Sequence, residues 1–473
     1  MKDYRKSVIL GIVFFLLFHS SAALETWQKS IGGIGSERGN AIIALPGGGF
    51  ALTGYTSSFG EGKKDVWFIR LTGTGDTLFT RSWGGGEDDE AHSVVQTADS
   101  GFILAGYTAS FGAGEKDAYL VRLRKDGDTL WTKTFGDTLD DIAHEIIVSS
   151  DGGFVFTGMA GRVVSSGAIS FDYNYIYLVK VNSAGDSLWS KTIKCASFDA
   201  GHSLCKTPEG GFMITGYQSY GMQNGSPGDY ADLVIVKTDS LGDTLWTRVY
   251  SGPTNYRYDA GNCIRPTSDS GFIIAGTTES FGQNYPDVFL LKTDARGDTL
   301  WTKSIGYTWP DYGHAVFERP MGGYYIAGSS IHPDESEFTT NIYLIKTDEW
   351  GDTLWSRHFG ELNVRDVGMD AAPTGNGGVI VTGAFGDFSF SGTTYDAALV
   401  YLNDTPVAIQ TEKPGPAKNL FPHKETIHAW DLRGRKINYS SITSPGVYII
   451  KYRQKARRSM KNMMPDGRSR IIY

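Results

Sequence analysis

The sequence predicts an all-β fold, a ring of seven four-stranded antiparallel sheets that is called a seven-bladed β-propeller. A short string built around a large aromatic residue returns along the chain at intervals of 52 to 58 residues, as GDTLFTR, GDTLWTK, GDSLWSK, GDTLWTR and GDTLWSR, after a divergent first copy, LETWQKS. Four apolar runs separated by turn-forming residues fill each interval, and none carries a long helical pattern with caps. A fixed period of this length is typical of repeat architectures.

The second repeat shows the four expected strands in order. They are predicted at residues 89–95, 102–106, 117–122 and 129–133. These runs are rich in Val, Ile, Tyr, Phe and Trp and are bounded by Gly, Asp and Ser, which is the composition of strands and their turns. We number the four strands of a repeat from the innermost, next to the ring axis, to the outermost.

The two ends of the repeat region predict how the ring closes. The region begins with a lone outermost-type strand at residues 24–30 and ends with a third-type strand at 396–402, after which no outermost strand follows. The simplest closure places the N-terminal strand in the last sheet, because this pairing removes an exposed sheet edge. The alternative, an open solenoid, leaves two bare edges.

A column of large aromatic residues lies in the expected outermost strands. Its members are Trp27, Phe79, Trp131, Trp189, Trp246, Trp301 and Trp355. We interpret the column as structural, because each outermost strand must dock on a neighbouring sheet and an aromatic ring there buries roughly 150–250 Å². Sugar stacking is the alternative, although sugar sites are seldom repeated on every blade.

Three further columns appear at the start of each innermost strand. An acid is present in every repeat: Glu37, Asp89, Asp141, Asp199, Asp259, Asp311 and Asp366. Two residues later comes Gly or Ala, and one residue after that come Asn40, His92, His144, His202, Asn262, His314 and Met369. Carboxylate and imidazole can ligate zinc or iron. We favour a structural network, in which each acid ties a turn and each histidine links strands within a blade, because working metal sites have few, asymmetric ligands.

The connections predict which face of the ring binds a partner. Turns between first and second strands and between third and fourth strands are short and Gly-containing, whereas the other loops, which share the opposite face, vary. Variable loops on a rigid scaffold commonly bind ligands. We therefore place any ligand over the third to sixth blades, with Tyr173, Tyr220, Tyr258 and Trp309 as contact candidates and His144, His202 and His314 deeper. The alternative is that these loops pack on each other.

The motif search predicts no cofactor and no catalysis. Acid-rich loops at 87–90 and 137–141 offer oxygen ligands for Ca²⁺, but they lack the spacing of a calcium loop and we interpret them as solvated charge. Nucleophile elbow, phosphate loop and metalloprotease helix motifs are absent. We predict a binding or adhesion module. The alternative is a polysaccharide hydrolase or lyase, which a pocket with two or more convergent titratable groups that break the repeat would favour.

The N-terminus and the cysteines predict an exported protein. Residues 1–23 read as a signal peptide, with Lys2, Arg5 and Lys6 before an apolar stretch at 8–18 and small residues at the cleavage position. Only three cysteines occur, Cys195, Cys205 and Cys263, which argues against a disulfide framework. Cys205 and Cys263 are expected to be buried apolar residues, and a Cys195–Cys205 bridge is the less favoured alternative.

Charge is distributed unevenly. Residues 418–473 carry 13 Lys and Arg against 3 Asp and Glu. Since the whole chain carries −8 and residues 1–23 carry +2, residues 24–417 carry a net −20. An acidic ring does not favour nucleic acid as a partner.

The repeat resembles those of bacterial secreted β-propeller repeat proteins. The resemblance rests on the pattern D-x-A-x-S-V-x-x-T-x-D-G-G-F-x-x-A-G-Y-T-x-S followed by D-x-Y-L-V-K-T-D-x-x-G-D-T-L-W, and it covers residues 24–404. Residues 405–417 read as a Pro-containing linker.

The C-terminal residues 418–473 carry a second resemblance. The strings WDLRGR at 430–435 and PGVYIIK at 445–451, after NLFP at 419–422, resemble a degenerate form of the C-terminal sorting domain of type IX secretion substrates. The resemblance implies a secreted or cell-surface protein with the type IX machinery as a partner. The alternative is a small β-appendage without a sorting role.

Overall fold

The computed structural model describes residues 26–403, with gaps at 167–168, 220–221, 224–225, 228–229, 253–256, 283–284, 332–338, 362–363 and 390–391. It also describes residues 428–430, 436–437 and 449–451. The chain divides into two compact units, residues 1–406 and 407–473. The predicted signal peptide at 1–23 and the predicted linker at 405–417 lie outside the described residues.

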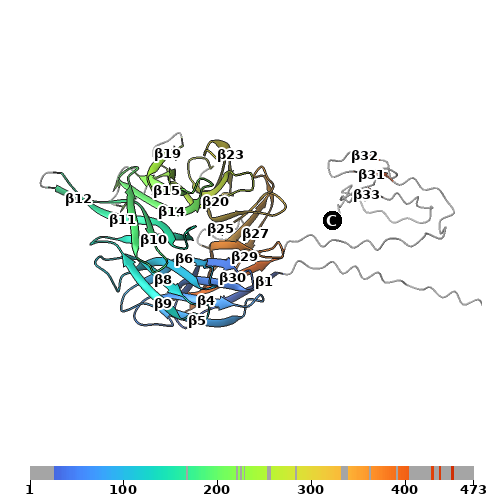
Figure 1. The fold of residues 1–473 in the computed structure, drawn as a ribbon. Helices are drawn as coiled ribbons and strands as arrows, with labels where there is room; N and C mark the ends of the chain where they lie inside the picture. Colours follow the sequence, from blue (N-terminus) through green and yellow to red (C-terminus); the bar gives the residue numbers. More distant parts are fainter. Residues whose placement is uncertain are drawn as a thin grey trace, which may run out of the picture. The chain divides into compact units, whose positions relative to one another are not determined.

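The first unit consists of four-stranded antiparallel sheets, and in all of them except the last the innermost strand comes first in sequence (Figure 1). Sheet I comprises β2 (Glu37–Ala44), β3 (Phe50–Thr56), β4 (Asp65–Leu71) and β5 (Thr77–Trp83), and sheet II comprises β6 (Asp89–Gln96), β7 (Phe102–Thr108), β8 (Asp117–Leu123) and β9 (Thr129–Phe135). Both match the order expected from the sequence.

Sheets III and IV are two such groups joined by a single parallel residue pair, Asn174 with Phe198. Sheet III comprises β10 (Asp141–Val148), β11 (Phe154–Ser166), β12 (Ile169–Val181) and β13 (Ser187–Ile193), and sheet IV comprises β14 (Phe198–Lys206), β15 (Phe212–Ser219), β18 (Asp232–Thr238) and β19 (Thr244–Tyr250). The two-residue strands β16 (Met222–Gln223) and β17 (Ser226–Pro227) pair in the loop of sheet IV.

The remaining sheets complete the unit. Sheet V comprises β20 (Asp259–Pro266), β21 (Phe272–Thr278), β22 (Asp287–Thr293) and β23 (Thr299–Ile305), and sheet VI comprises β24 (Asp311–Glu318), β25 (Tyr324–Ser330), β26 (Asn341–Thr347) and β27 (Thr353–Phe359). Sheet VII comprises β28 (Val367–Pro373), β29 (Val379–Ser389), β30 (Gly392–Leu402) and the N-terminal strand β1 (Thr26–Ile31). In the second unit, β31 (His428–Trp430), β32 (Lys436–Ile437) and β33 (Ile449–Lys451) form a three-stranded sheet.

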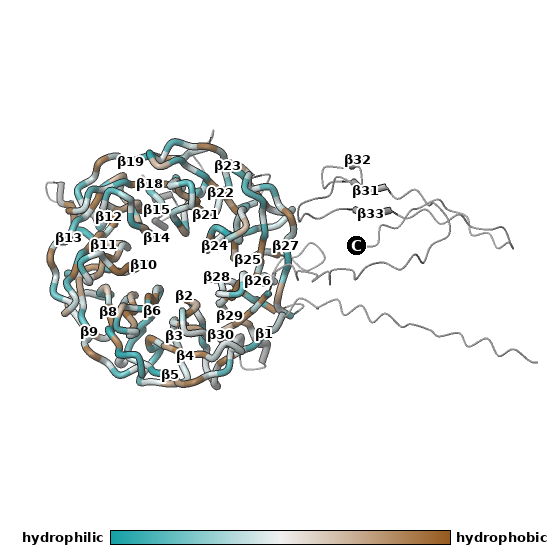
Figure 2. Tube along the Cα trace, turned by 45° about the vertical axis from the view of Figure 1, so that its right-hand side comes forward, coloured by the Kyte–Doolittle hydropathy of each residue, from teal (hydrophilic) through white to brown (hydrophobic). Residues whose placement is uncertain are grey.

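The sheets surround a central opening, with innermost strands toward it and outermost strands at the rim (Figure 2). Strand β1 pairs with β30 from Thr26–Leu402 to Ile31–Ala397, so the first strand of the chain is the outermost strand of its last sheet. This arrangement is that of a β-propeller, and the prediction of an all-β chain of four-stranded antiparallel sheets is confirmed.

The core lies between neighbouring sheets. In one cluster Phe68 of sheet I packs with Phe102 of sheet II, their ring centroids 4.9 Å apart, and in another Leu52 of sheet I packs with Leu399 of sheet VII. The two middle strands of each sheet are rich in apolar residues, and strands such as β3 and β8 are buried along their length because both of their faces contact another sheet. Outermost strands have exposed, half-buried and buried positions.

Six of the seven aromatic residues of the outermost column, all except Trp355, contact a glycine turn in the following sheet. A Cβ atom added at Gly297 would lie 2.5 Å from the ring of Trp246, and φ at Gly297 is +78°. The same pairing joins Trp27 to Gly75, Phe79 to Gly127, Trp131 to Gly185, Trp189 to Gly242 and Trp301 to Gly351. Glycine is therefore required twice at this turn, once by the backbone angle and once by the ring that covers it.

The other residues of the repeated string reinforce this contact with an ion pair. In five repeats the cation two residues after the aromatic reaches the aspartate that follows the glycine in the next sheet. The N···O distances are 2.6 Å for Lys29–Asp76, 3.3 Å for Lys133–Asp186, 2.7 Å for Lys191–Asp243, 2.8 Å for Arg248–Asp298 and 2.6 Å for Lys303–Asp352. We call the aromatic–glycine contact and this ion pair the rim latch.

Prediction for the rim latch. Gly297→Ala should lower the free energy of unfolding by about 1–3 kcal/mol, because the new Cβ is strained at positive φ and meets the ring of Trp246. Denaturant unfolding measures the change. Gly47→Ala is the matched control, since a Cβ at Gly47 meets nothing within 4 Å. Equal stability of the two variants would contradict the role given to the latch.

Prediction for the N-terminal strand. Deletion of residues 24–30 should destabilise the first unit by roughly 3 kcal/mol or more, because it removes most of the outermost strand of sheet VII together with Trp27. Thermal unfolding followed by circular dichroism measures the loss. An unchanged melting temperature would show that β1 does not hold sheet VII to sheet I.

Candidate functional site

The histidine column occupies a β-bulge in each innermost strand. The pairing register shifts on either side of His92, between Ala91 and Ser93, and the same shift occurs at Asn40, His144, His202, Asn262, His314 and Met369. A bulge adds one residue that has no partner opposite, and it turns that side chain away from the regular alternation. These residues line the cavity at the centre of the ring.

The bulge residues bond neighbouring sheets to one another. The Nδ1 atom of His144 lies 3.0 Å from the carbonyl oxygen of Gly201, and equivalent bonds join His92 to Ala143, His202 to Gly261 and His314 to Gly368. Asn40 and Asn262 donate in the same way, each at 2.8 Å, to Ala91 and Gly313. The prediction that each histidine links strands within a blade is therefore wrong, because the bulge directs the ring to the carbonyl of the next sheet.

These bonds fix the histidine tautomer. A carbonyl oxygen only accepts hydrogen bonds, so the bonded Nδ1 carries the proton and Nε2 presents a lone pair. Burial lowers the pKa of His202 and His314, and that of His144 well below its ordinary value, so all three are neutral at neutral pH. Within the described part of the chain, Nε2 of His144, His202 and His314 has no hydrogen-bond partner, and none of the three is among the fully buried unpaired atoms.

The entry acids tie the loops of one face. Gly33 donates to Glu37 at 2.8 Å, Asp137 to Asp141 at 2.9 Å and Tyr307 to Asp311 at 2.6 Å, each from the backbone amide. A second set of donors comes from the loops after the second strands, such as Ser110 to Asp89 at 2.7 Å. Glu37 and Asp89 therefore join the two loops that were predicted to share a face, whereas Asp199 accepts from the loop before it, and Asp259 accepts from residues 278–280 at the end of the second strand. Burial raises the pKa of Asp141, Asp199 and Asp311 to about 6.

The cavity at the ring centre has a volume of about 780 Å³ and is lined by the innermost strands of sheets I to VII. Small residues in these strands allow the sheets to approach closely, since a Cβ at Gly201 would meet Thr157 and one at Gly261 would meet Thr215 of the preceding sheet. A volume of this size is in the usual range for small-molecule sites.

Three charged residues of the cavity lining, Glu145, Arg265 and Asp370, depart from the repeat within three positions of the bulge, and the sequence reasoning missed them. Lys206 and Glu318, one position further along their strands, are the other charged residues of the lining. Glu145 and Asp370 stand one residue after the bulge, where the other sheets have Ala41, Ser93, Ser203, Cys263 and Ala315. Arg265 stands two residues further, where the others have Ile43, Val95, Ile147, Cys205, Phe317 and Ala372. Extending the comparison of repeats by three positions beyond the histidines would have found all three.

Glu145 and Asp370 each accept a backbone amide of the following sheet. Leu204 donates to Glu145 at 2.9 Å and Ile42 donates to Asp370 at 2.9 Å. Glu145 also accepts from the Ser203 hydroxyl and pairs with Arg265 at 2.9 Å. Burial raises the pKa of Asp370 to about 6, although the Ile42 amide and Arg265 act in the opposite direction.

A second hollow lies on the loop face, between the loop after β21 and the segment after β23. Its volume is about 470 Å³, and its lining includes Phe281, Asp287, Ser304, Tyr307 and Thr308. Phe281 and Tyr307 have exposed fractions of 44% and 41%. The residues that follow Gly84 and Gly136 in sheets I and II are Gly85 and Asp137, so Tyr307 is a feature of this sheet alone among the three.

The predicted ligand contacts are distributed over several clusters. Tyr258 lies next to Tyr217, with ring centroids 6.2 Å apart, and Tyr217 lies 5.3 Å from His202, so Tyr258 connects to the histidines. Tyr173 packs on Phe198 at 5.7 Å, and Trp309 packs on Tyr285 at 5.5 Å beside the loop-face hollow. Tyr220 falls outside the described residues.

The rings of His92, His144 and His202 follow one another around the cavity at 5.6 and 5.3 Å. Nevertheless, within the described residues no group of three or more His, Cys, Asp or Glu is placed to hold a metal ion. Cys195, Cys205 and Cys263 are free thiols, and Cys205 and Cys263 are buried.

The interpretation of both acid-rich loops as solvated charge is wrong in part. Asp89, Glu90 and Asp141 are buried, because the protein supplies their donors: Gly85 for Asp89, Arg38 and Asn40 for Glu90, and Asp137 for Asp141. In the first loop only Glu87 and Asp88 keep substantial exposure.

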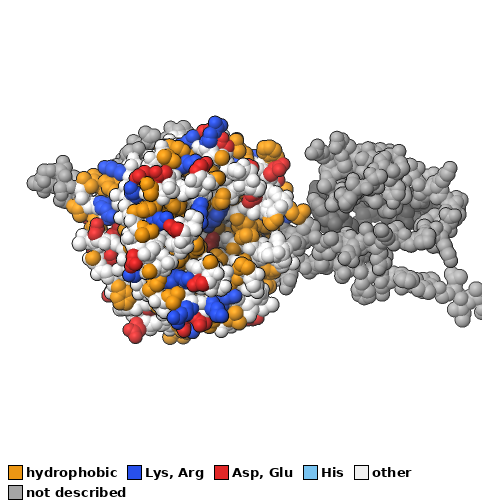
Figure 3. Space-filling model, in the orientation of Figure 1, with side chains coloured by type: hydrophobic (Ala, Val, Ile, Leu, Met, Phe, Trp, Pro, Cys, Tyr) orange, Lys and Arg blue, Asp and Glu red, His pale blue; other side chains and the backbone are white. Residues whose placement is uncertain are grey.

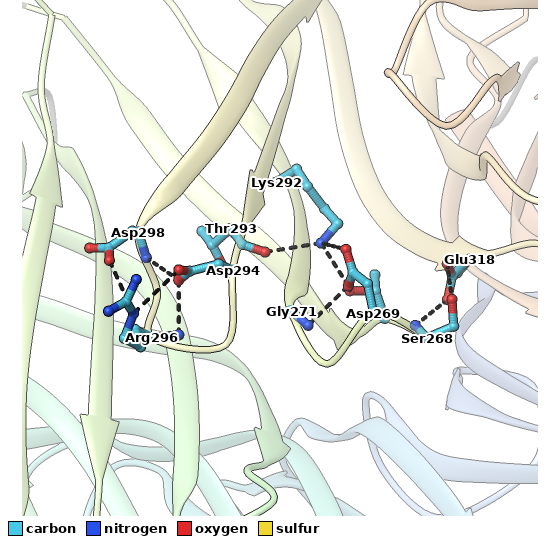
Figure 4. A network of polar contacts seen from close by, with 10 residues as sticks. Ser268, Asp269, Gly271, Lys292, Thr293, Asp294, Arg296, Asp298 and Glu318 are labelled. Carbon is cyan, nitrogen blue, oxygen red and sulfur yellow. Dashed lines mark hydrogen bonds and ion pairs between the residues drawn. The ribbon is translucent and has the colours of Figure 1, made fainter.

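The opposite face consists of turns whose polar groups are bonded internally (Figure 4). Asp269 accepts from Lys292 at 2.8 and 3.0 Å and from the Gly271 amide at 3.0 Å, while Asp294 accepts from the amides of Arg296 and Asp298 at 2.9 and 2.8 Å. Figure 3 shows acidic, basic and apolar side chains interspersed over the surface in view.

No family model and no curated protein matches the chain. Among solved structures, the periplasmic gluconolactonase PpgL of Pseudomonas aeruginosa is 8% identical, covering 72% of this chain and 98% of its own, with a TM-score of 0.46. The WD40 domain of Neurospora crassa Pan2 is 9% identical over 67% and 90%, with a TM-score of 0.39. Chaetomium thermophilum Sqt1 bound to the N-terminus of ribosomal protein L10 is 10% identical over 80% and 100%, with a TM-score of 0.44. Likeness at this level carries no conclusion about activity or partners.

Prediction for the histidine column. His144→Asn should keep the bond to Gly201, because Asn40 and Asn262 make that bond in their own sheets. The folded-state pKa of His144 lies below its unfolded value, so the unfolded chain binds protons first as the pH falls below about 6.5. The wild type should therefore lose about 1 kcal/mol relative to His144→Asn between neutral pH and about pH 5.

Urea unfolding of both chains at a series of pH values measures this difference. The raised carboxyl pKa values of Asp141, Asp199 and Asp311 act in the opposite direction over the same window, and they cancel in the comparison because both chains contain them. A stability difference that stays constant with pH would contradict the neutral state assigned to His144.

Proposed function

We propose that the chain is an exported, non-enzymatic binding or adhesion module built on a closed seven-bladed β-propeller. Closure is supported by contacts between sheet VII, which holds the N-terminal strand, and sheet I: Trp27 covers Gly75, Lys29 pairs with Asp76, and Asp370 accepts from the amide of Ile42. The aromatic–glycine contact also joins each of sheets I to V to the sheet that follows it. The contacts between the last sheet and the first are therefore of the same kind as those that join successive sheets from I to VI.

Export is proposed from the sequence of residues 1–23, with its basic start, apolar stretch and small residues before position 24. No helix of the described residues is long and apolar enough to cross a membrane. For the second unit we propose recognition by the type IX secretion machinery. The resemblance of residues 418–473 to a sorting domain supports this, and β31, β32 and β33 pair as a small sheet within that segment.

The observation that carries the binding function is the loop-face hollow. Exposed rings of Phe281 and Tyr307 stand beside the hydroxyls of Ser304 and Thr308, and the tilted ring pair Tyr285–Trp309 adjoins them. Flat aromatic faces beside hydroxyl and carboxylate groups suit a carbohydrate, whose CH faces pack on rings while its hydroxyls bond. We therefore propose an extracellular glycan as the partner, over sheets V and VI on the predicted face. An exposed peptide is the alternative partner.

A second candidate function is a polysaccharide hydrolase or lyase, which the cavity at the ring centre favours. Glu145 and Asp370 break the repeat and line the same cavity, and glycoside hydrolases usually act through a pair of carboxyl groups. Both carboxyl groups accept a hydrogen bond from a backbone amide of the next sheet, and Glu145 also forms an ion pair with Arg265. We rank binding first because these contacts give both carboxyl groups a structural role.

Prediction for the binding function. In a screen of extracellular polysaccharides against the exported chain, Trp309→Ala and Tyr307→Ala should each weaken binding about thirtyfold, since loss of an aromatic anchor costs roughly 2 kcal/mol or more. Tyr220→Ala should do so if that residue contacts the same glycan. Trp350→Ala is the matched control, because Trp350 is 62% exposed in a turn between the third and fourth strands, on the opposite face.

Each glycan that binds is also incubated with the chain and examined for shortened or unsaturated products. Product formation that is lost in Glu145→Gln or Asp370→Asn would replace the binding proposal by the hydrolase or lyase. Weaker binding by Trp350→Ala, with Trp309→Ala unchanged, would show that the partner uses the opposite face.

A further inference from the structure

Arg265 is one of two cations in the cavity lining, with Lys206, and it departs from the residue type of its own column. Arg265 lies in β20 at a position where six other innermost strands carry Ile, Val, Cys, Phe or Ala. Apolar residues of several sizes therefore fill this position in the other sheets. A guanidinium introduced here must be desolvated in part, and it is retained only where charge partners offset that cost. Packing alone does not account for Arg265.

The neighbours of Arg265 use only one edge of the guanidinium. Its Nη1 atom donates to the carbonyl of Ile264 at 2.9 Å and to the Ser203 hydroxyl at 3.2 Å, and it pairs with Glu145 at 2.9 Å. Among the described residues, neither Nη2 nor Nε of Arg265 has a partner, and neither is a fully buried unpaired atom. The side chain is 34% exposed, and it lines the cavity. One edge is anchored, and the other faces the cavity.

The free edge has the geometry of a carboxylate site. Nε and Nη2 donate in parallel, which matches the two oxygens of a carboxylate. A phosphate has similar oxygens, but it brings more negative charge into a cavity whose lining holds Glu145, Glu318 and Asp370 against the cations Arg265 and Lys206. A singly charged carboxylate meets less repulsion from these groups. The charge balance therefore favours a monocarboxylate over a phosphate.

The histidines define the other end of the ligand. The bulge column precedes the Arg265 column by three residues along the innermost strand, which is roughly 10 Å. There Nε2 of His144, His202 and His314 offers lone pairs with no described partner, while Nδ1 is held by a carbonyl. Lone pairs require donors, and hydroxyl groups supply them without adding charge. A ligand that spans the two columns thus has hydroxyls at one end and a carboxylate at the other.

We propose that the cavity at the ring centre binds a small hydroxy-carboxylate, such as a sugar acid, with its carboxylate on Nε and Nη2 of Arg265 and its hydroxyl groups toward His144, His202 and His314. Glu145 and Ser203 act as positioning residues, because they fix the Nη1 edge and so orient the free edge. The site is separate from the loop-face hollow, and loss of glycan binding in Trp309→Ala leaves it unaffected.

The test is calorimetric titration of the exported chain, from residue 24 onward, at neutral pH. Two matched pairs serve as probes: gluconate with glucitol, and glucuronate with glucose, so that within each pair the principal difference is the carboxylate. Each acid should bind at least about tenfold more tightly than its uncharged counterpart. Arg265→Gln should abolish this preference, and Arg265→Lys should reduce it because lysine keeps the charge but lacks the fork. Arg296→Gln, the same change at an exposed turn of the same sheet, should retain it.

A second measurement covers the case in which Arg265→Gln does not fold. Histidine Cε1–Hε1 signals of the unmodified chain, assigned with His144→Asn, should move on addition of gluconate and stay in place with glucitol. The proposal is overturned if neither acid binds, if acid and uncharged counterpart bind equally, if Arg265→Gln keeps the preference, or if the histidine signals do not respond to gluconate.

Discussion

The contact between an aromatic ring and a glycine turn in the next sheet is the constraint on which the rest of the structure depends. It fixes the spacing at the rim, because the turn cannot hold a side chain where the ring lies. The paired cation and aspartate then hold the register of the two sheets. Since the aromatic and glycine sides of the latch belong to one short string, one copy can contact the next, as six of them do. A head-to-tail contact of this kind can form a ring.

The same logic operates at the ring centre with polar groups. Each bulge residue reaches the carbonyl of the next sheet, and Asn and His do so interchangeably because both present a donor there. Met369 lacks a donor and interrupts the series. The small residue next to the bulge lets neighbouring sheets approach. Neighbouring sheets are thus held together by one kind of contact at the rim and by another kind at the centre.

A scaffold made by repetition separates structural residues from others. Positions that recur in every sheet hold the ring, whereas those that depart from the repeat are free to serve a ligand. The departures gather at two places: Glu145, Arg265 and Asp370 in the cavity, and Tyr307 with Trp309 on the loop face. The turn face is different, because carboxylates such as Asp269 and Asp294 accept hydrogen bonds from the backbone amides of their own turns. The first group lines the cavity at the ring centre and the second lies at the loop-face hollow, so the two groups suit different ligands.

The sequence by itself determined the strand order, the four-stranded unit and the sharing of one face by the variable loops, because these follow from local alternation, turn chemistry and the period. It also placed the histidines in one column. Only the tertiary structure decided what the columns contact. That His144 bonds sheet IV, that Trp246 covers Gly297, and that Arg265 reaches past sheet IV to Glu145 in sheet III are relations between strands about 50 to 120 residues apart. A single sequence shows the period of such residues but not the direction of their side chains, which the bulge and the curvature of the ring decide.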